Sequence, residues 1–159
     1  QAKITTADRK VIEKAKQRSK NPEIPTAAIE LEDGTIITSE TSDLLGTSAA
    51  LLLNAAKYLA NIDHKVKLIP KNMIEPIQKM KVSYLRGNNP RLHTDEVLVA
   101  LAMLSNTDEN CRRALEQLPK LAGCQVHTTV MLSEVDKKIF KKLGVDVTSE
   151  PIRKKSKSL

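Results

Sequence analysis

Apolar residues along this chain recur at helical spacing in six segments, and five shorter runs are rich in residues that favour strands. The predicted helices cover residues 6–19 and 43–60, together with segments that begin near residues 72, 94, 108 and 133. The predicted strands cover residues 26–31, 35–38, 66–69, 124–132 and 145–148. The predicted order is therefore helix, two strands, helix, strand, three helices, strand, helix and strand.

This order of elements predicts an α/β fold. The first two strands form a hairpin, and after it strands alternate with helices, which favours parallel pairing of the later strands. We expect a three-layer α/β sandwich around a mixed, mostly parallel sheet of four or five strands. By composition, residues 1–25 form an N-terminal helix and linker, residues 26–151 the α/β domain, and residues 152–159 a basic, disordered tail.

The predicted helices differ in how much apolar surface they carry. Leucines lie all around the helix at residues 43–60, which is typical of a buried central helix. The helix at residues 6–19 has only a thin stripe of Val11, Ile12 and Ala15, so we expect it to pack loosely or against material outside this chain. The helix that begins near residue 72 is predicted to turn an apolar face inward, formed by Met73, Ile74, Ile77, Met80 and Tyr84.

Composition and charge change this picture in two ways. Only three of the 159 residues are Phe or Tyr and none is Trp, which argues against modules that bind nucleic acids by stacking bases on aromatic side chains. The formal net charge is +7, but the Lys and Arg residues near the two ends account for most of it. We therefore interpret the basic ends as solvated segments, and nucleic-acid binding is not expected.

The two cysteines, Cys111 and Cys124, lie in a predicted helix and a predicted strand and form no CxxC pair. Buried thiols in a reducing compartment are the expected state, which indicates a cytoplasmic location. No run of apolar residues approaches the length of a membrane span, so no contact with a membrane is expected. The chain begins with Gln1 rather than Met, which suggests processing or excision from something longer.

The predicted order of elements is the same as in the cytidine-deaminase fold, but this is a resemblance in topology alone. A zinc deaminase needs a His or Cys and a Glu at the start of one helix and a CxxC motif at the start of the next. The corresponding helices here begin with residues 41–44 and 72–75, which offer no His or Cys. We therefore expect no zinc site, and no other metal or cofactor motif is present.

The richest polar cluster lies at residues 88–96, where a loop leads into a predicted helix. Backbone N–H groups at this helix start, with Arg91 and His93 beside them, could hold an anion. Asp95 and Glu96 offer the alternative of a helix entrance whose acids serve the helix dipole, and these acids would repel an anion. Arg91, His93, Asp95 and Glu96 are therefore candidate ligand-binding residues.

A second candidate cluster is His127 with Thr129, which share one face of a predicted strand. The alternative is a histidine that is hydrogen-bonded in the core. If the two clusters lay at the same end of the sheet, His93 and His127 could face one cleft.

Several long segments resemble one uncharacterised bacterial family, catalogued as domain of unknown function 1846 and as uncharacterised protein family 0371. The matching strings are TSDLLGTSAALLLNA at residues 41–55, IEPI at 74–77, NPRLHTDEVL at 89–98, ALEQLPKL at 114–121 and GC at 123–124. The resemblance implies a C-terminal subdomain of proteins about three times as long, which carry a phosphate-loop-like segment upstream. Where that family usually reads TGKTS, residues 38–42 read TSETS, which weakens the case for an anion at that loop.

Two functions of different class follow. The first is a structural or interaction domain that packs on an upstream domain of the same protein and helps it form a homo-oligomer. The second is a ligand-binding or active-site surface, formed by Arg91, His93 and Glu96 and completed by the upstream region. No catalytic residue is assigned in either case.

Overall fold

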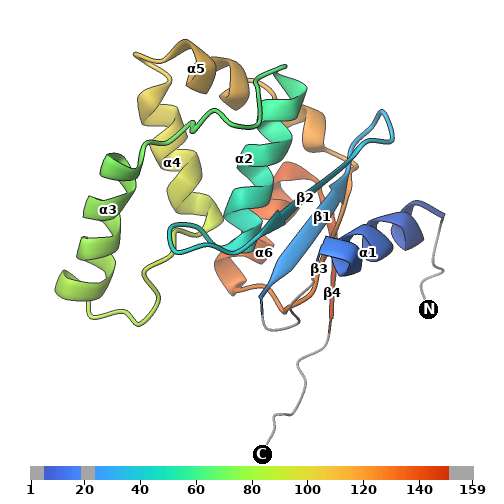
Figure 1. Ribbon diagram of the computed structural model, residues 1–159, viewed down its shortest axis with the longest axis horizontal. Helices are drawn as coiled ribbons and strands as arrows, with labels where there is room; N and C mark the ends of the chain where they lie inside the picture. The colour runs from blue at the N-terminus through green and yellow to red at the C-terminus, as the bar shows by residue number, and fades with distance from the viewer. Residues whose placement is uncertain (1–5, 19–23, 151–159) are drawn as a thin grey trace, which may run out of the picture.

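Four short strands form one mixed sheet in the computed structural model, which describes residues 6–18 and 24–150 (Figure 1). The strands are β1 (Thr26–Glu30), β2 (Ile36–Glu40), β3 (Gln125–Thr128) and β4 (Asp146–Ser149), in the order β2-β1-β3-β4. Strand β1 is antiparallel to both β2 and β3, and only β3 and β4 are parallel. The mixed sheet is confirmed, but the prediction that it is mostly parallel is wrong. Part of the predicted linker and the basic tail lie outside the described residues.

The missing fifth strand explains this error. Residues 66–69 were predicted as a strand, but they run over α2 (Thr47–Leu59) as irregular backbone. Lys57 donates a hydrogen bond to the carbonyl of Val66, and the Cys111 thiol donates to the carbonyl of Leu68. Side chains thus take carbonyl groups that a strand neighbour would otherwise use.

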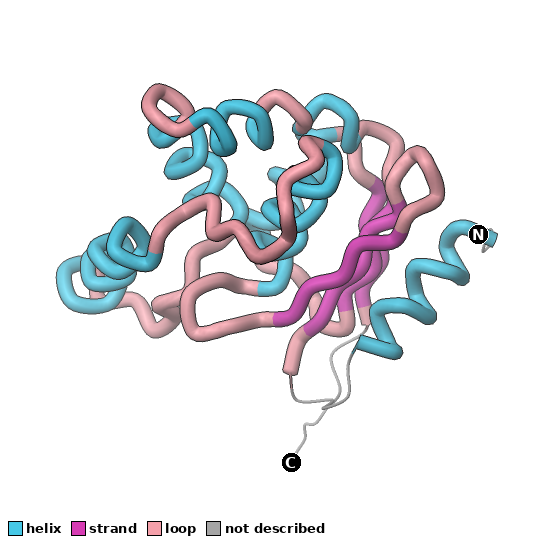
Figure 2. The backbone as a smooth tube through the Cα atoms, turned by 45° about the horizontal axis from the view of Figure 1, so that its top comes forward, coloured by secondary structure: helices cyan, strands magenta, loops and turns pink. Residues whose placement is uncertain are grey.

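The remaining helices are α1 (Thr6–Arg18), α3 (Lys71–Lys79), α4 (Thr94–Leu104), α5 (Glu109–Leu115) and α6 (Glu134–Leu143). A π-helix, η1 (Met80–Tyr84), continues α3, and a short 3-10 helix, η2 (Leu118–Leu121), precedes β3. Figure 2 shows α1 on one face of the sheet and the other helices on the opposite side, so the described elements form three layers.

Helix α1 packs closely on the sheet. Val11 and Ala15 are buried against Ala28 of β1, and the Thr26 hydroxyl donates to the carbonyl of Ala15 over 3.0 Å. Small side chains on both elements allow the helix to approach the strand. The expectation of loose packing is therefore wrong.

Helix α2 is the central helix, as predicted from its leucines. Leu51, Leu52 and Ala55 are buried in the core between α2 and the sheet. On its other side, Leu53 and Ala56 are buried in a second core with α4 and α5. Two cores on opposite sides of one helix require the apolar pattern that runs around it.

Strand β3 is shorter than predicted and ends at Thr128, beside contacts that join Thr129 to Thr26. The Thr129 N–H donates to the Thr26 carbonyl over 2.9 Å. The Thr129 hydroxyl accepts a hydrogen bond from the Thr26 N–H over 3.0 Å, and the chain then leaves the sheet toward α6. The Ser133 hydroxyl caps α6, and Gly144 ends it at φ +81°.

Both cysteines are free and buried, as predicted. Burial raises the pKa of the Cys111 thiol to about 11. Within the described residues, no helix is long and apolar enough to cross a membrane.

Candidate functional site

The predicted cluster at residues 88–96 surrounds the start of α4, where Glu96 is already paired. Its Oε1 atom accepts hydrogen bonds from the His93 N–H and from the Lys81 ammonium, both over 2.8 Å. Burial alone would raise the pKa of Glu96, but these two hydrogen bonds and the nearby positive charge hold that pKa below its usual value. Glu96 is therefore ionised at neutral pH and serves both α4 and Lys81.

Lys81 was missed in the sequence, although it lies at the centre of this cluster. Its ammonium also donates to the carbonyl of Arg91 and lies 3.4 Å from His93 Nδ1. Lys81 is part of η1, and the chain folds back at once, because the Gly87 N–H donates to the carbonyl of Lys81. A Cβ atom at position 87 would lie 3.0 Å from that oxygen, so glycine permits the turn. No sequence pattern marks a π-helix, which is why Lys81 was not predicted.

Arg91 and Asp95 hold different positions around the same helix start. Arg91 donates from Nε to the carbonyl of Ser42, which ties the loop before α4 to the loop before α2. Asp95 is exposed and its carboxylate accepts from the Glu96 N–H over 2.8 Å. Asp95 and Glu96 thus both accept from N–H groups at the start of α4, as the capping alternative expects.

Three helices begin around one pocket of about 290 Å³, and the starts of α2 and α4 lie close together in Figure 1. Arg91 and His93 line this pocket from the α4 side, Ser48 lines it from α2, and Asp136 lines it from α6. Asp136 is buried, and its Oδ1 atom accepts from the N–H and the hydroxyl of Thr94 over 3.0 and 2.6 Å. Neither Ser48 nor Asp136 was predicted as a site residue, since each is an ordinary residue in the first turn of a helix.

His127 and Thr129 do not belong to this pocket. The His127 side chain is 5% exposed and lies on the same face of the sheet as Ala28, toward α1. Its ring nitrogens lie 2.7 Å from Thr148 Oγ1 and 2.8 Å from Glu150 Oε2. His93 and His127 therefore do not face one cleft, and the contacts of His127 match those of a hydrogen-bonded core residue.

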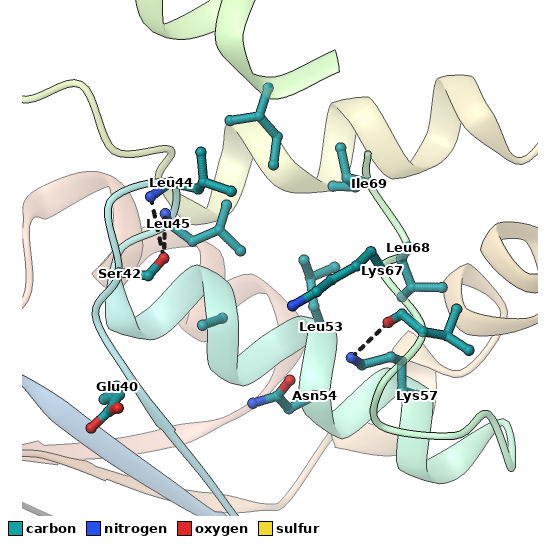
Figure 3. Close-up of a pocket in the computed structure, with 13 residues that line it drawn as sticks. Glu40, Ser42, Leu44, Leu45, Leu53, Asn54, Lys57, Lys67, Leu68 and Ile69 are labelled. Atoms are coloured by element: carbon teal, nitrogen blue, oxygen red, sulfur yellow. Dashed lines mark hydrogen bonds between the residues drawn. The ribbon is translucent and has the colours of Figure 1, made fainter. Parts of the chain in front are cut away.

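A second pocket, of about 210 Å³, lies between α2 and residues 66–69 (Figure 3). Leucines form much of its wall, and the buried Lys57 ammonium donates to the carbonyls of His64 and Val66 over 2.8 and 3.0 Å. Burial, with a smaller contribution from the charge of Lys67, lowers the pKa of Lys57. The ammonium of Lys57 thus holds the irregular segment against α2.

No group of three or more His, Cys, Asp or Glu side chains is arranged to hold a metal ion within residues 6–18 and 24–150.

The fold and these pockets define an α/β domain with one mixed four-stranded sheet, helices on both faces and a pocket at three helix starts. Over residues 7–158 the sequence matches the family described as domain of unknown function DUF1846, C-terminal. The chain belongs to this family, whose function is not characterised.

Relatives named UPF0371 protein support the same assignment. The chain is 54% identical to one from Corynebacterium aurimucosum over 95% of the chain and 30% of that relative. It is 52% identical to one from Corynebacterium diphtheriae over 98% of the chain and 31% of that relative. It is 43% identical to one from Streptococcus pneumoniae serotype 19F over 93% of the chain and 30% of that relative. The chain therefore spans about 30% of the length of the relatives it matches.

Proposed function

We propose that this chain is an interaction domain, and that α3 and η1 are the surface through which it binds the rest of a longer protein. We call α3, η1 and the adjoining Leu85 the arm. The observation that carries this proposal is the exposed apolar surface of the arm. Ile74 is the buried residue of α3, and η1 has none. Five other apolar side chains along the arm are exposed: Met73, Met80, Val82, Tyr84 and Leu85.

The sequence pattern explains why this surface is unusual. Met73, Met80 and Tyr84 were predicted to face a core, but the described residues supply no core there. Tyr84 and Leu85 are 67% and 68% exposed, and the arm lies at the edge of the molecule, away from the sheet (Figures 1 and 2). Large apolar side chains that stay exposed along one element of a folded domain favour an interaction site there.

The length of the relatives indicates an occupant for this surface. About 70% of each related protein lies outside the match, and a domain in one polypeptide is held near the domain that it contacts. We therefore assign the surface to the unmatched region of the longer protein rather than to a second copy of this chain.

Binding to the unmatched region of the Corynebacterium aurimucosum relative tests this proposal. That region and the 159-residue chain would be produced separately and titrated by calorimetry. Tyr84→Ser with Leu85→Ser should weaken binding at least tenfold, because both side chains would lose buried apolar contacts. Val135→Ser on α6 is the matched control, since Val135 is also exposed and lies on another element.

Two outcomes would contradict the proposal. Equal binding by the double variant and the control would show that the arm is not the contact surface. Dimerisation of the chain alone, lost in the double variant, would assign the arm to self-association.

A second function, the contribution of a ligand-binding surface, is supported by the position of Arg91 and His93 on the pocket wall. Glu96 is less suited to this role, because its carboxylate is paired with Lys81. The cytidine-deaminase-like topology, a cytoplasmic location, homo-oligomer formation and the lack of nucleic-acid binding stay predictions.

A further inference from the structure

The first turn of α2 carries N–H groups that no part of the described chain accepts. Gly46 is the N-cap residue and has no side chain to accept a hydrogen bond. The first N–H bonded to a carbonyl at this end is that of Ala50, which donates to Gly46. Within residues 6–18 and 24–150, the N–H groups of Thr47, Ser48 and Ala49 have no acceptor.

The Ser48 side chain is an independent sign of a missing partner. Ser48 is 2% exposed and lines the pocket at the helix starts, yet its Oγ atom has no hydrogen-bond partner among the described residues. A buried hydroxyl without a partner is unfavourable and rare in folded proteins. A polar group bound in the pocket would satisfy both the hydroxyl and the free N–H groups.

The charges around the pocket favour an anion. Arg91 lines it and uses Nε to bind the carbonyl of Ser42, while its two Nη groups have no partner in the described part of the chain. Asp136 is the one carboxylate among the described residues that line this pocket, and its Oδ1 atom is bonded to Thr94. The positive end of the α2 dipole adds to the charge of Arg91.

We propose that this pocket binds a tetrahedral oxyanion, either free phosphate or the phosphoryl group of a larger ligand. The N–H groups at the start of α2 and the Ser48 hydroxyl donate to its oxygens, and so does the guanidinium of Arg91, which lines the same pocket. These donors outnumber what a carboxylate can accept in one plane, and they suit an anion with oxygens in several directions. The site uses residues 46–49 and does not depend on the TSETS sequence at residues 38–42.

Calorimetric titration of the 159-residue chain with sodium phosphate tests the proposal, in a buffer free of phosphate and sulfate. The expected result is saturable binding that sodium chloride at the same ionic strength does not reproduce. A second titration uses ATP. If ATP binds and competes with phosphate, the site takes the phosphoryl group of a nucleotide. If the chain binds phosphate but does not bind ATP, the site takes the free anion.

Ser48→Ala separates a binding role from a structural one. It should weaken phosphate binding about tenfold or more, because one hydrogen bond to a charged group is lost. Without phosphate it should melt no lower than the parent, since it removes a buried hydroxyl that has no partner. Arg91→Gln should also weaken binding, while Ser105→Ala, at the far end of α4, should leave it unchanged.

Three results would overturn the proposal. The parent chain could show no saturable phosphate binding, or chloride could produce the same heat. Ser48→Ala could also bind phosphate as tightly as Ser105→Ala, which would show that the hydroxyl does not contact the anion.

Discussion

The starts of α4 and α2 lie at the same pocket and differ in how their donors are satisfied. At α4, Glu96 accepts from the His93 N–H, and Asp136 accepts from the Thr94 N–H and hydroxyl. At α2, the N-cap residue is Gly46, and no side chain in the described part of the chain accepts from the first turn. Protein carboxylates thus accept from the donors at the start of α4, whereas among the described residues the donors at the start of α2 have no acceptor.

This difference shows that richness in polar residues and availability for a ligand are separate properties. The start of α4 attracted attention in the sequence because charged residues gather there. Those same residues satisfy one another, so Glu96 is committed to Lys81 and the helix dipole. The segment at residues 41–46, before α2, carries less charge, and more of the N–H groups at the start of that helix are left without an acceptor among the described residues.

The largest effect on stability is expected from replacing Asp136, which lies on α6 and accepts hydrogen bonds at the start of α4. Asp136→Ala should lower the free energy of unfolding by about 3 kcal/mol, because it leaves the buried N–H and hydroxyl of Thr94 without an acceptor. Unfolding in urea, followed by circular dichroism, measures this loss. Asp136→Asn keeps an acceptor oxygen and should lose clearly less. A loss below about 1 kcal/mol in the alanine variant would show that α4 does not depend on this carboxylate.

A smaller effect is expected from Glu96, and it should depend on pH. Glu96→Gln should lower the free energy of unfolding by about 1 kcal/mol at pH 7, since the ion pair with Lys81 is lost and the amide can still accept from His93. Because the folded-state pKa of Glu96 is lowered, its stabilising contribution is present above the unfolded pKa and is lost as pH falls through the folded one.

The parent and the Glu96→Gln variant should therefore differ most at neutral pH and converge in acid. Urea unfolding of both proteins between pH 3 and pH 7 measures this, and Lys81→Gln should reduce the difference by removing the partner. A difference that stays constant over this range would mean that the ionised carboxylate contributes nothing specific.

Much of the fold could be predicted from local patterns. The leucines of α2 are such a local pattern, and the buried central helix that they predict is the one observed. The Ser133 hydroxyl and Gly144, at the two ends of α6, also act within a few residues of the chain. The prediction of a strand at residues 66–69 was wrong because the conformation of this segment depends on residues far away in the sequence. Val66 and Leu68 have a strand-like composition, but Lys57 and Cys111 take their carbonyl groups.

The candidate site was harder to predict, for the same physical reason. The sequence singled out Arg91 and His93, and both line the pocket. It could not show that His127 faces α1 or that Lys81 reaches Glu96, because both depend on which face of an element is covered. Ser48 had no distinguishing feature at all, since a serine in the first turn of a helix is common and its missing partner is visible only in three dimensions.

The smallest effect in stability would come from giving α2 the cap that it lacks. At position 46 the backbone is extended, with φ −68° and ψ 163°, and an added Cβ would lie 3.6 Å from the carbonyl of Leu92, an ordinary contact. Gly46→Asp should therefore place a carboxylate over the free N–H groups and raise the free energy of unfolding by about 0.5 kcal/mol. The same carboxylate would occupy the anion position and repel phosphate, so phosphate binding should disappear while the fold is retained. Gly46→Ala adds the Cβ without an acceptor and should gain no stability. If Gly46→Asp were less stable than Gly46→Ala, the donors at the start of α2 would not be free, and the contrast between the two helix starts would be wrong.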